Sequence, residues 1–291
     1  MDAAIGDALF GRLFRGRVHS VFAQAVNFAA SRTRLYSLVA EELDDAPGTV
    51  RVRVSQDRPL DNLGIRPGDA VISTAGGLSC GSVPVLAANV RPWSPTLPPF
   101  PSTPAGRRRL AASLDIFINA IVAYGREGGL KAFISGDART LIEKRLVERA
   151  AAVVSAFVAG SPDEALTTGK GLIGLGTGLT PSGDDFLAGM MVIINMPAGP
   201  FDRQHRKVAA ALAAGAETGT VSRAMLRHAA RGRTRAGVVA LLEAMTDRPP
   251  HDVAAAARKV LCSGATSGTD LAAGIAAGLS AGLELAGEEE E

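Results

Sequence analysis

The sequence is poor in cysteine and in excess charge, and each shortage excludes a class of protein. Its 291 residues include two cysteines, Cys80 and Cys262, which form neither a metal-binding spacing nor a disulfide framework. The 31 basic residues nearly balance the 29 acidic ones, which argues against the broad basic surface of a nucleic-acid-binding protein. We therefore expect no nucleic-acid partner, and reduced cysteines of the kind typical of a cytoplasmic protein.

Long apolar runs are also missing. The longest, from Phe186 to Met196, falls well short of the roughly 20 residues that cross a bilayer. The segment Met1–Gly6 carries an acid and no basic residue ahead of an apolar stretch, so it does not resemble a secretory signal. We expect no membrane anchor.

Aromatic residues make up only 4% of the chain, whereas glycine alone accounts for 33 residues. Such a chain fills its interior with small side chains, which lets helices approach one another closely. Gly274, Gly278 and Gly282 recur every four residues, so they share one face of a predicted helix. This spacing predicts close helix packing there.

Six prolines between Pro92 and Pro104 divide the chain. Proline lacks the backbone donor and restricts φ, so this stretch forms neither a helix nor a central strand. We predict a strand-rich N-terminal domain over residues 1–100 and a mainly helical domain over residues 101–291. The fold class is then α+β.

Residue patterns on either side of the prolines support this division. Val50–Val54 alternates apolar and basic residues and Asp69–Ser73 follows a turn, so both are predicted strands, whereas Val18–Phe28 fits a strand or a mixture of strand and helix. After the prolines the pattern changes to helical spacing with helix start signals. The predicted helices are Leu110–Tyr124, Arg139–Val158, one starting at Ser161, Asp202–Ala214, Val221–Ala230, Ala236–Met245, Val253–Leu261 and Leu271–Leu285.

The segment from Gly171 to Gly189 is the strongest candidate for chemistry. Glycines let a ligand approach the backbone, whose N–H groups can converge on an anion, and the helix that follows favours negative charge at its start. Neither the Walker nor the dinucleotide-binding glycine pattern is present. We expect the backbone and hydroxyl groups of this segment to bind a small anionic substrate; these donors are Gly176, Gly178, Thr180, Ser182 and Gly183.

Two acids follow these donors. Asp184 is the predicted catalytic residue, ordering a metal or a substrate amide, and Asp184 with Asp185 could hold Mg²⁺. The structural alternative is a capping box of Ser182 with Asp185, in which Asp185 only stabilises its own helix. We expect a ligand or metal role for Asp184 and a capping role for Asp185.

Two further polar segments are expected to meet the glycine-rich segment. Ser267–Gly274 matches Ser182–Gly189 at five of eight positions, which suggests two helix starts facing one cleft. Ser267, Gly268 and Asp270 are then candidate substrate-binding residues, with a capping role favoured for Asp270. Thr218 and Ser222, from the start of another predicted helix, are candidates as well, and Arg223 of the same helix could reach the same cleft.

Gly174–Gly189, with the segments Thr218–Ser222 and Gly264–Asp270, strongly resembles the signature of the AllH family. The resemblance implies a subunit of an oxamate carbamoyltransferase in allantoin catabolism. Such a subunit works beside AllF- and AllG-like partners, with carbamoyl phosphate, oxamate and oxalurate as reactants and products. It does not say which subunit carries the chemistry.

Two other hypotheses stay open. The same loop could hold a Mg-nucleotide in a small-molecule phosphotransferase, or the glycine helices could simply pack in a non-catalytic assembly subunit. ATP-dependent turnover by the isolated chain would favour the first. A melting temperature that does not shift with phosphate, carbamoyl phosphate or oxamate would favour the second.

Overall fold

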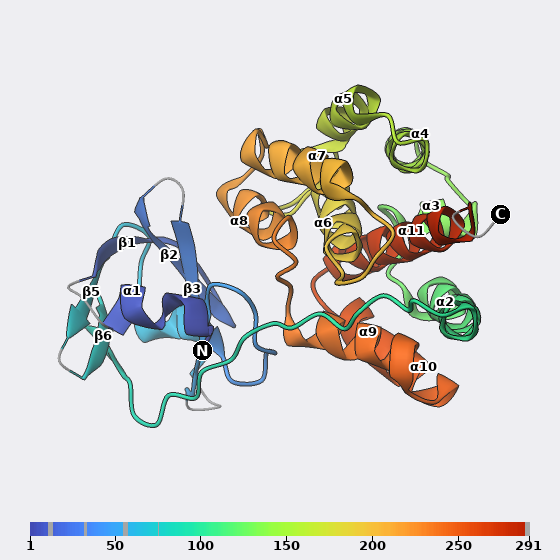
Figure 1. Cartoon of the computed structure of the whole chain (residues 1–291). Coiled ribbons are helices and arrows are strands. Elements are labelled where there is room, and N and C mark those ends of the chain that lie inside the picture. The colour runs from blue at the N-terminus through green and yellow to red at the C-terminus, as the bar shows by residue number, and fades with distance from the viewer. Residues whose placement is uncertain (11–13, 32–33, 55–57, 75, 289–291) are drawn as a thin grey trace. The chain divides into compact units, whose positions relative to one another are not determined.

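The computed structural model describes residues 1–10, 14–31, 34–54, 58–74 and 76–288. The chain forms two compact units, Met1–Pro95 and Thr96–Glu291, so the boundary falls within the proline-rich stretch. The strands belong to the first unit and the long helices to the second, which confirms the predicted α+β class (Figure 1). Among the described residues, no helix is both long enough and apolar enough to cross a membrane.

The N-terminal unit contains one seven-stranded sheet with the strand order β4-β3-β2-β1-β5-β6-β7. All neighbours are antiparallel except β3 and β4, which pair in parallel. The strands are β1 (Arg15–Phe22), β2 (Ala25–Ser31), β3 (Arg34–Ala40), β4 (Thr49–Val52), β5 (Ala70–Thr74), β6 (Gly77–Cys80) and β7 (Val83–Leu86). Short helices accompany them: η1 (Ala3–Ile5), α1 (Gly6–Phe10) and η2 (Leu60–Leu63).

The undecided segment Val18–Phe28 forms two strands, β1 and β2, joined by a tight turn. The core of this unit concentrates several of the few aromatic residues in the chain. Phe14 packs edge-on against both Phe28 and Tyr36, with ring centroids 5.7 and 5.6 Å apart. These rings supply a large apolar area in a sheet of short strands.

The two cysteines differ sharply in exposure, and we expect thiol reagents to distinguish them. Cys80 in β6 is fully buried, and this burial, with the charge of Asp69, raises its pKa to about 11. Cys262 is exposed. Since only the thiolate reacts, iodoacetamide at pH 8 should modify Cys262 alone in the folded chain and both cysteines in denaturant.

Mass spectrometry after timed labelling checks this expectation, with Cys262→Ser as the control that should remain unlabelled when folded. Because the pKa of Cys80 is raised on folding, its stabilising contribution is complete below the unfolded pKa of the thiol. That contribution is lost as pH rises through about 11. Comparable labelling of Cys80 and Cys262 in the folded chain would contradict the burial of Cys80.

The C-terminal unit contains ten helices among the described residues. They are α2 (Pro104–Tyr124), α3 (Lys131–Ser135), α4 (Leu141–Val158), α5 (Pro162–Leu172), α6 (Ser182–Ile194), α7 (Arg203–Ala214), α8 (Thr220–Ala229), α9 (Ala236–Asp247), α10 (Pro250–Leu261) and α11 (Ser267–Glu288). The predicted helices all form, with ends shifted by a few residues. α2 begins at Pro104 rather than Leu110, because Thr103 caps it and proline is favoured in a first turn.

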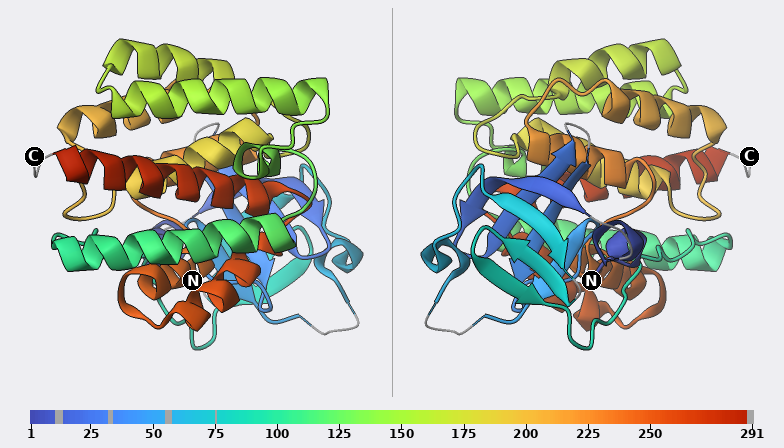
Figure 2. Two further views of the ribbon diagram at one scale, coloured as in Figure 1. Left: turned by 90° about the vertical axis from the view of Figure 1, so that its right-hand side faces the viewer. Right: turned by 90° about the vertical axis from the view of Figure 1, so that its left-hand side faces the viewer.

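The centre of this unit is the pair α6 and α11, which pack along each other (Figures 1 and 2). Every residue of α6 is buried, so α6 is a core helix covered by its neighbours. Gly189 and Gly274 lie where the two backbones approach. A Cβ at Gly274 would lie 2.0 Å from the carbonyl oxygen of Phe186, and one at Gly189 would lie 2.3 Å from that of Leu271.

The predicted packing role of the repeated glycines in α11 is confirmed. Beyond Gly274, a Cβ at Gly278 would lie 3.0 Å from the side chain of Ile193, and one at Gly282 would lie 3.1 Å from the ring of Phe100. Small residues on one face therefore let α11 sit against α6 and its surroundings at short range.

Candidate functional site

The glycine-rich segment forms a loop between α5 and α6. Gly174, Gly176 and Gly178 all have positive φ, between 74° and 121°, which other residues rarely adopt. A Cβ at Gly176 would also lie 2.6 Å from the backbone nitrogen of Ser182. The loop conformation therefore requires the alternating glycines, which explains part of the pattern without a ligand.

Asp184 fastens the start of this loop. It is fully buried in the first turn of α6. Its Oδ1 accepts a hydrogen bond from the backbone N–H of Gly174 at 2.8 Å, and its Oδ2 accepts one from the Thr218 hydroxyl at 2.5 Å. One carboxylate thus ties the loop to the segment that precedes α8.

A further contact joins the loop to the start of α8: the Ser222 hydroxyl donates to the carbonyl oxygen of Leu179 at 3.5 Å. Within the segment that leads into α8, the Arg223 guanidinium donates to the carbonyl oxygen of Thr218 at 2.7 Å. On the other side, the Thr180 hydroxyl donates to that of Ser267 at 3.3 Å. The structure therefore brings together all three polar segments singled out in the sequence.

Backbone donors of the predicted site fall into two groups. The N–H of Gly183 donates to the carbonyl oxygen of Leu175 at 2.9 Å, and that of Gly268 donates to Ser263 at 2.8 Å. Neither amide is free to meet a ligand, so the expectation that Gly183 and Gly268 supply backbone donors is corrected. Both glycines instead let a helix start pass close to the end of the preceding helix, where a Cβ would meet a carbonyl oxygen.

The amides of residues 176–180 form the other group. Within the described part of the chain, none of them donates to a protein acceptor. Thr177, Gly178 and Leu179 are exposed, so these donors lie at the surface. The tip of the loop, unlike its ends, keeps its N–H groups available to a ligand.

The predicted capping roles are wrong. Pro181 precedes α6 without any side-chain cap, and Ser182 is the first helical residue rather than the cap. Asp270 does not cap its own helix either; its Oδ1 accepts from the backbone N–H of Leu130 at 2.6 Å. Asp184, Asp185 and Asp270 lie in the first turns of α6 and α11 and are fully buried, so their carboxylates face neighbouring elements of the unit.

Asp185 and Asp270 form a pair of buried acids. Burial raises the pKa of Asp185 well above its ordinary value, opposed by the Ser267 and Thr180 hydroxyls and reinforced by the charge of Asp270. Burial also raises the pKa of Asp270, opposed by the Leu130 amide and the Ser182 and Thr266 hydroxyls. The Ser267 and Thr180 hydroxyls lie near Asp185. Neither carboxylate oxygen of Asp185, however, has a partner in hydrogen-bonding geometry among the described residues.

The predicted metal site depends on two acids, Asp184 and Asp185. The described residues contain no group of three or more His, Cys, Asp and Glu side chains placed to hold a metal. Both oxygens of Asp184 already accept hydrogen bonds, whereas those of Asp185 do not. The Mg²⁺ role of Asp184 and Asp185 stays a prediction, and the contacts of Asp184 indicate that it positions the loop.

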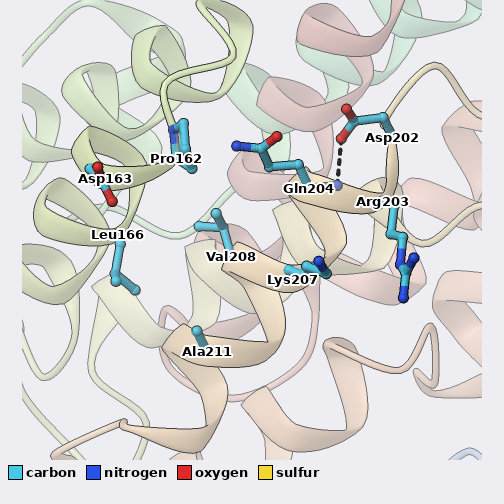
Figure 3. A pocket seen from close by; sticks show the side chains of 9 residues that line it. All are labelled: Pro162, Asp163, Leu166, Asp202, Arg203, Gln204, Lys207, Val208 and Ala211. Carbon is cyan, nitrogen blue, oxygen red and sulfur yellow. Dashed lines mark hydrogen bonds between the residues drawn. The ribbon is translucent and has the colours of Figure 1, made fainter.

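Surface cavities lie beside α8 and between α5 and α7. One, of about 510 Å³, is lined by Ala214, Gly215, Ala216, Glu217, Thr218, Arg223 and Arg227, and so includes the residue that Asp184 holds. The other, of about 620 Å³, lies between α5 and α7 (Figure 3). Its Asp202 already accepts from the Gln204 N–H, and none of the sequence-predicted site residues lines it.

Comparison with known families places both halves of the chain. Residues 172–279 match the family model described as oxamate carbamoyltransferase subunit AllH, and residues 1–91 match that of the AllH family N-terminal domain. The chain belongs to the AllH family. The match from residue 172 covers the glycine loop, α8 and the first half of α11, which are the elements that build the site. No solved structure matches the chain.

Sequence reasoning missed two parts of this candidate site. Arg227 lines the cavity one helical turn after Arg223, and Leu130 supplies the N–H that Asp270 accepts. The positions i and i+4 on a helix starting at Thr220 would have placed both arginines on one face. The pair Gly128–Gly129 marks the turn that receives Asp270, since a Cβ at Gly129 would lie 2.3 Å from that carboxylate.

Proposed function

We propose that this chain is the AllH-type subunit of a carbamoyltransferase complex and binds a small anionic substrate beside the glycine loop. The family supports the general activity. The binding site rests on one observation. The amides of residues 176–180 have no protein acceptor in the described chain, and they lie beside the segment that leads into a cavity lined by arginines. Carbamoyl phosphate and oxamate both carry the negative charge that such donors bind.

Three features of the site favour an anion. Backbone N–H groups in a glycine loop form a concave set of donors, and the first turn of α8 adds its own positive dipole end. Arg223 and Arg227 line the cavity, and arginine matches carboxylate and phosphate with paired donors. Thr218 and Ser222 then act by holding these elements together.

The proposed reaction moves a carbamoyl group between phosphate and the amide nitrogen of oxamate. Charge develops on the carbamoyl and phosphate oxygens, and fixed donors aimed at such oxygens stabilise a transition state. In this proposal Asp184 acts through the loop rather than on the substrate, since both of its oxygens are occupied. AllF- and AllG-like subunits are the expected partners, and they complete the transferase.

A ligand screen on the full chain tests the proposal. Melting temperatures are measured with phosphate, carbamoyl phosphate, oxamate, oxalurate and ATP, each with and without Mg²⁺. A ligand at about 100 times its Kd adds about 2.7 kcal/mol, which raises Tm by about 5 °C or more for a unit of this size. A shift with ATP and Mg²⁺ alone would indicate a phosphotransferase, and no shift with any ligand would indicate an assembly subunit.

Replacing Arg223 locates the site more sharply. We expect Arg223→Gln to weaken binding of carbamoyl phosphate by at least about tenfold, because a charged donor to the anion is lost. Isothermal titration calorimetry measures the change. Arg203→Gln is the matched control, since Arg203 lines the other cavity, between α5 and α7 (Figure 3). Equal losses in both variants would contradict a site at α8.

A further inference from the structure

The starts of α6 and α11 exchange polar contacts. Asp185, in the first turn of α6, lies near the hydroxyl of Ser267, the first residue of α11. Asp270, in the first turn of α11, lies near the hydroxyl of Ser182, the first residue of α6. The repeated sequence therefore produces a reciprocal arrangement in which each acid faces the serine of the other helix.

Three oxygen atoms in this cluster lack partners. Both carboxylate oxygens of Asp185 and Oδ2 of Asp270 are buried and have no hydrogen-bond partner among the described residues. Both side chains are fully buried. A buried carboxylate with unsatisfied oxygens is strongly unfavourable unless a positive group or a proton compensates it.

We propose that Asp185 and Asp270, with the hydroxyls of Ser182, Ser267 and Thr180, bind one dehydrated cation between the starts of α6 and α11. The donors are all oxygen, which hard cations prefer. Two carboxylates balance a positive charge in a site where both acids are shielded from solvent. Ca²⁺ or K⁺ fits better than Mg²⁺, because Mg²⁺ gives up its water shell reluctantly.

The proposed cation would also stabilise the glycine loop. Thr180 stands at the end of the loop, and its hydroxyl donates to Ser267 within the cluster. Asp184 holds the start of the same loop through Gly174. A cation on the Asp185–Asp270 pair would therefore fix the second end of the segment whose tip carries the free amides.

The test uses the full chain without any substrate, so its outcome does not depend on anion binding. The protein is stripped with a chelator, dialysed into choline chloride, and titrated with CaCl₂, KCl, NaCl or MgCl₂ at constant ionic strength. We expect Ca²⁺ or K⁺ to raise Tm by about 5 °C or more at 100 times its Kd. Calorimetry and elemental analysis should show one cation per chain.

Variants locate the site. Asp185→Asn and Asp270→Asn should each weaken cation binding by more than about tenfold. Asp163→Asn, an exposed acid in the first turn of α5, should leave it unchanged. Should the aspartate variants not fold, Ser267→Ala removes one neutral donor and should weaken binding while keeping the helix start.

Two outcomes would overturn the proposal. One is a wild-type chain whose melting temperature rises no more with Ca²⁺ or K⁺ than with choline. The other is a cation response that persists in Asp185→Asn, which would place the cation elsewhere. The first outcome would mean that a proton, not a metal cation, compensates the two acids.

Discussion

Replacing Gly274 with alanine is expected to lower the free energy of unfolding by about 3 kcal/mol or more. A Cβ at this position would lie 2.0 Å from the carbonyl oxygen of Phe186 and 2.7 Å from its carbon. Backbone atoms of a fully buried helix cannot rotate away as a flexible side chain would, so α6 and α11 must separate. Urea unfolding followed by circular dichroism measures the change.

Gly287→Ala is the matched control for this prediction. Gly287 belongs to the same helix and is exposed, and a Cβ added there would have no neighbouring atom within 4 Å. Alanine should therefore stabilise the chain there, by up to about 1 kcal/mol, because it favours the helix over the unfolded chain. If Gly274→Ala proved as well tolerated as Gly287→Ala, the close approach of α6 and α11 would be wrong.

Removing the Asp184 carboxylate is expected to release the glycine loop. Asp184→Ala deletes two partly buried hydrogen bonds to a carboxylate, each worth about 1.5–3 kcal/mol, and leaves the Gly174 amide and Thr218 hydroxyl without their partner. We expect stability to fall by about 3 kcal/mol or more. We also expect binding of carbamoyl phosphate to weaken by at least about tenfold, measured by calorimetry at a temperature where the variant is folded.

Two further variants separate loop positioning from general damage. Thr218→Val removes one of the two hydrogen bonds and should cause a smaller loss of both stability and binding. Asp163→Ala, at an exposed first-turn acid, should change stability by no more than about 0.5 kcal/mol. Full binding by Asp184→Ala would show that the loop does not need its anchor.

Local patterns in the sequence predicted most of the helices, but among the strands only β4 and β5. The helical spacing from Arg139 to Val158 predicted α4, and the alternation at Val50–Val54 predicted β4. Both predictions succeed because the spacing of apolar residues, and the residues that begin or end an element, are local properties of the sequence. Val18–Phe28 remained undecided, since a short polar turn at its middle separates two strands that only their pairing identifies. The same limit applies to capping: Ser182 and Asp185 match a capping box in sequence, but inward burial gives them other neighbours.

The sequence by itself determined the division into a strand-rich and a helical part, the need for glycine in the loop, and membership in the AllH family. Each depends on residue order alone. Only the tertiary structure decided which amides remain free and which acids meet. Gly183 and Gly176 are both glycines of the same segment, yet the Gly183 amide donates to Leu175 and the Gly176 amide has no protein acceptor among the described residues, because the way the loop folds back on the start of α6 decides the pairing.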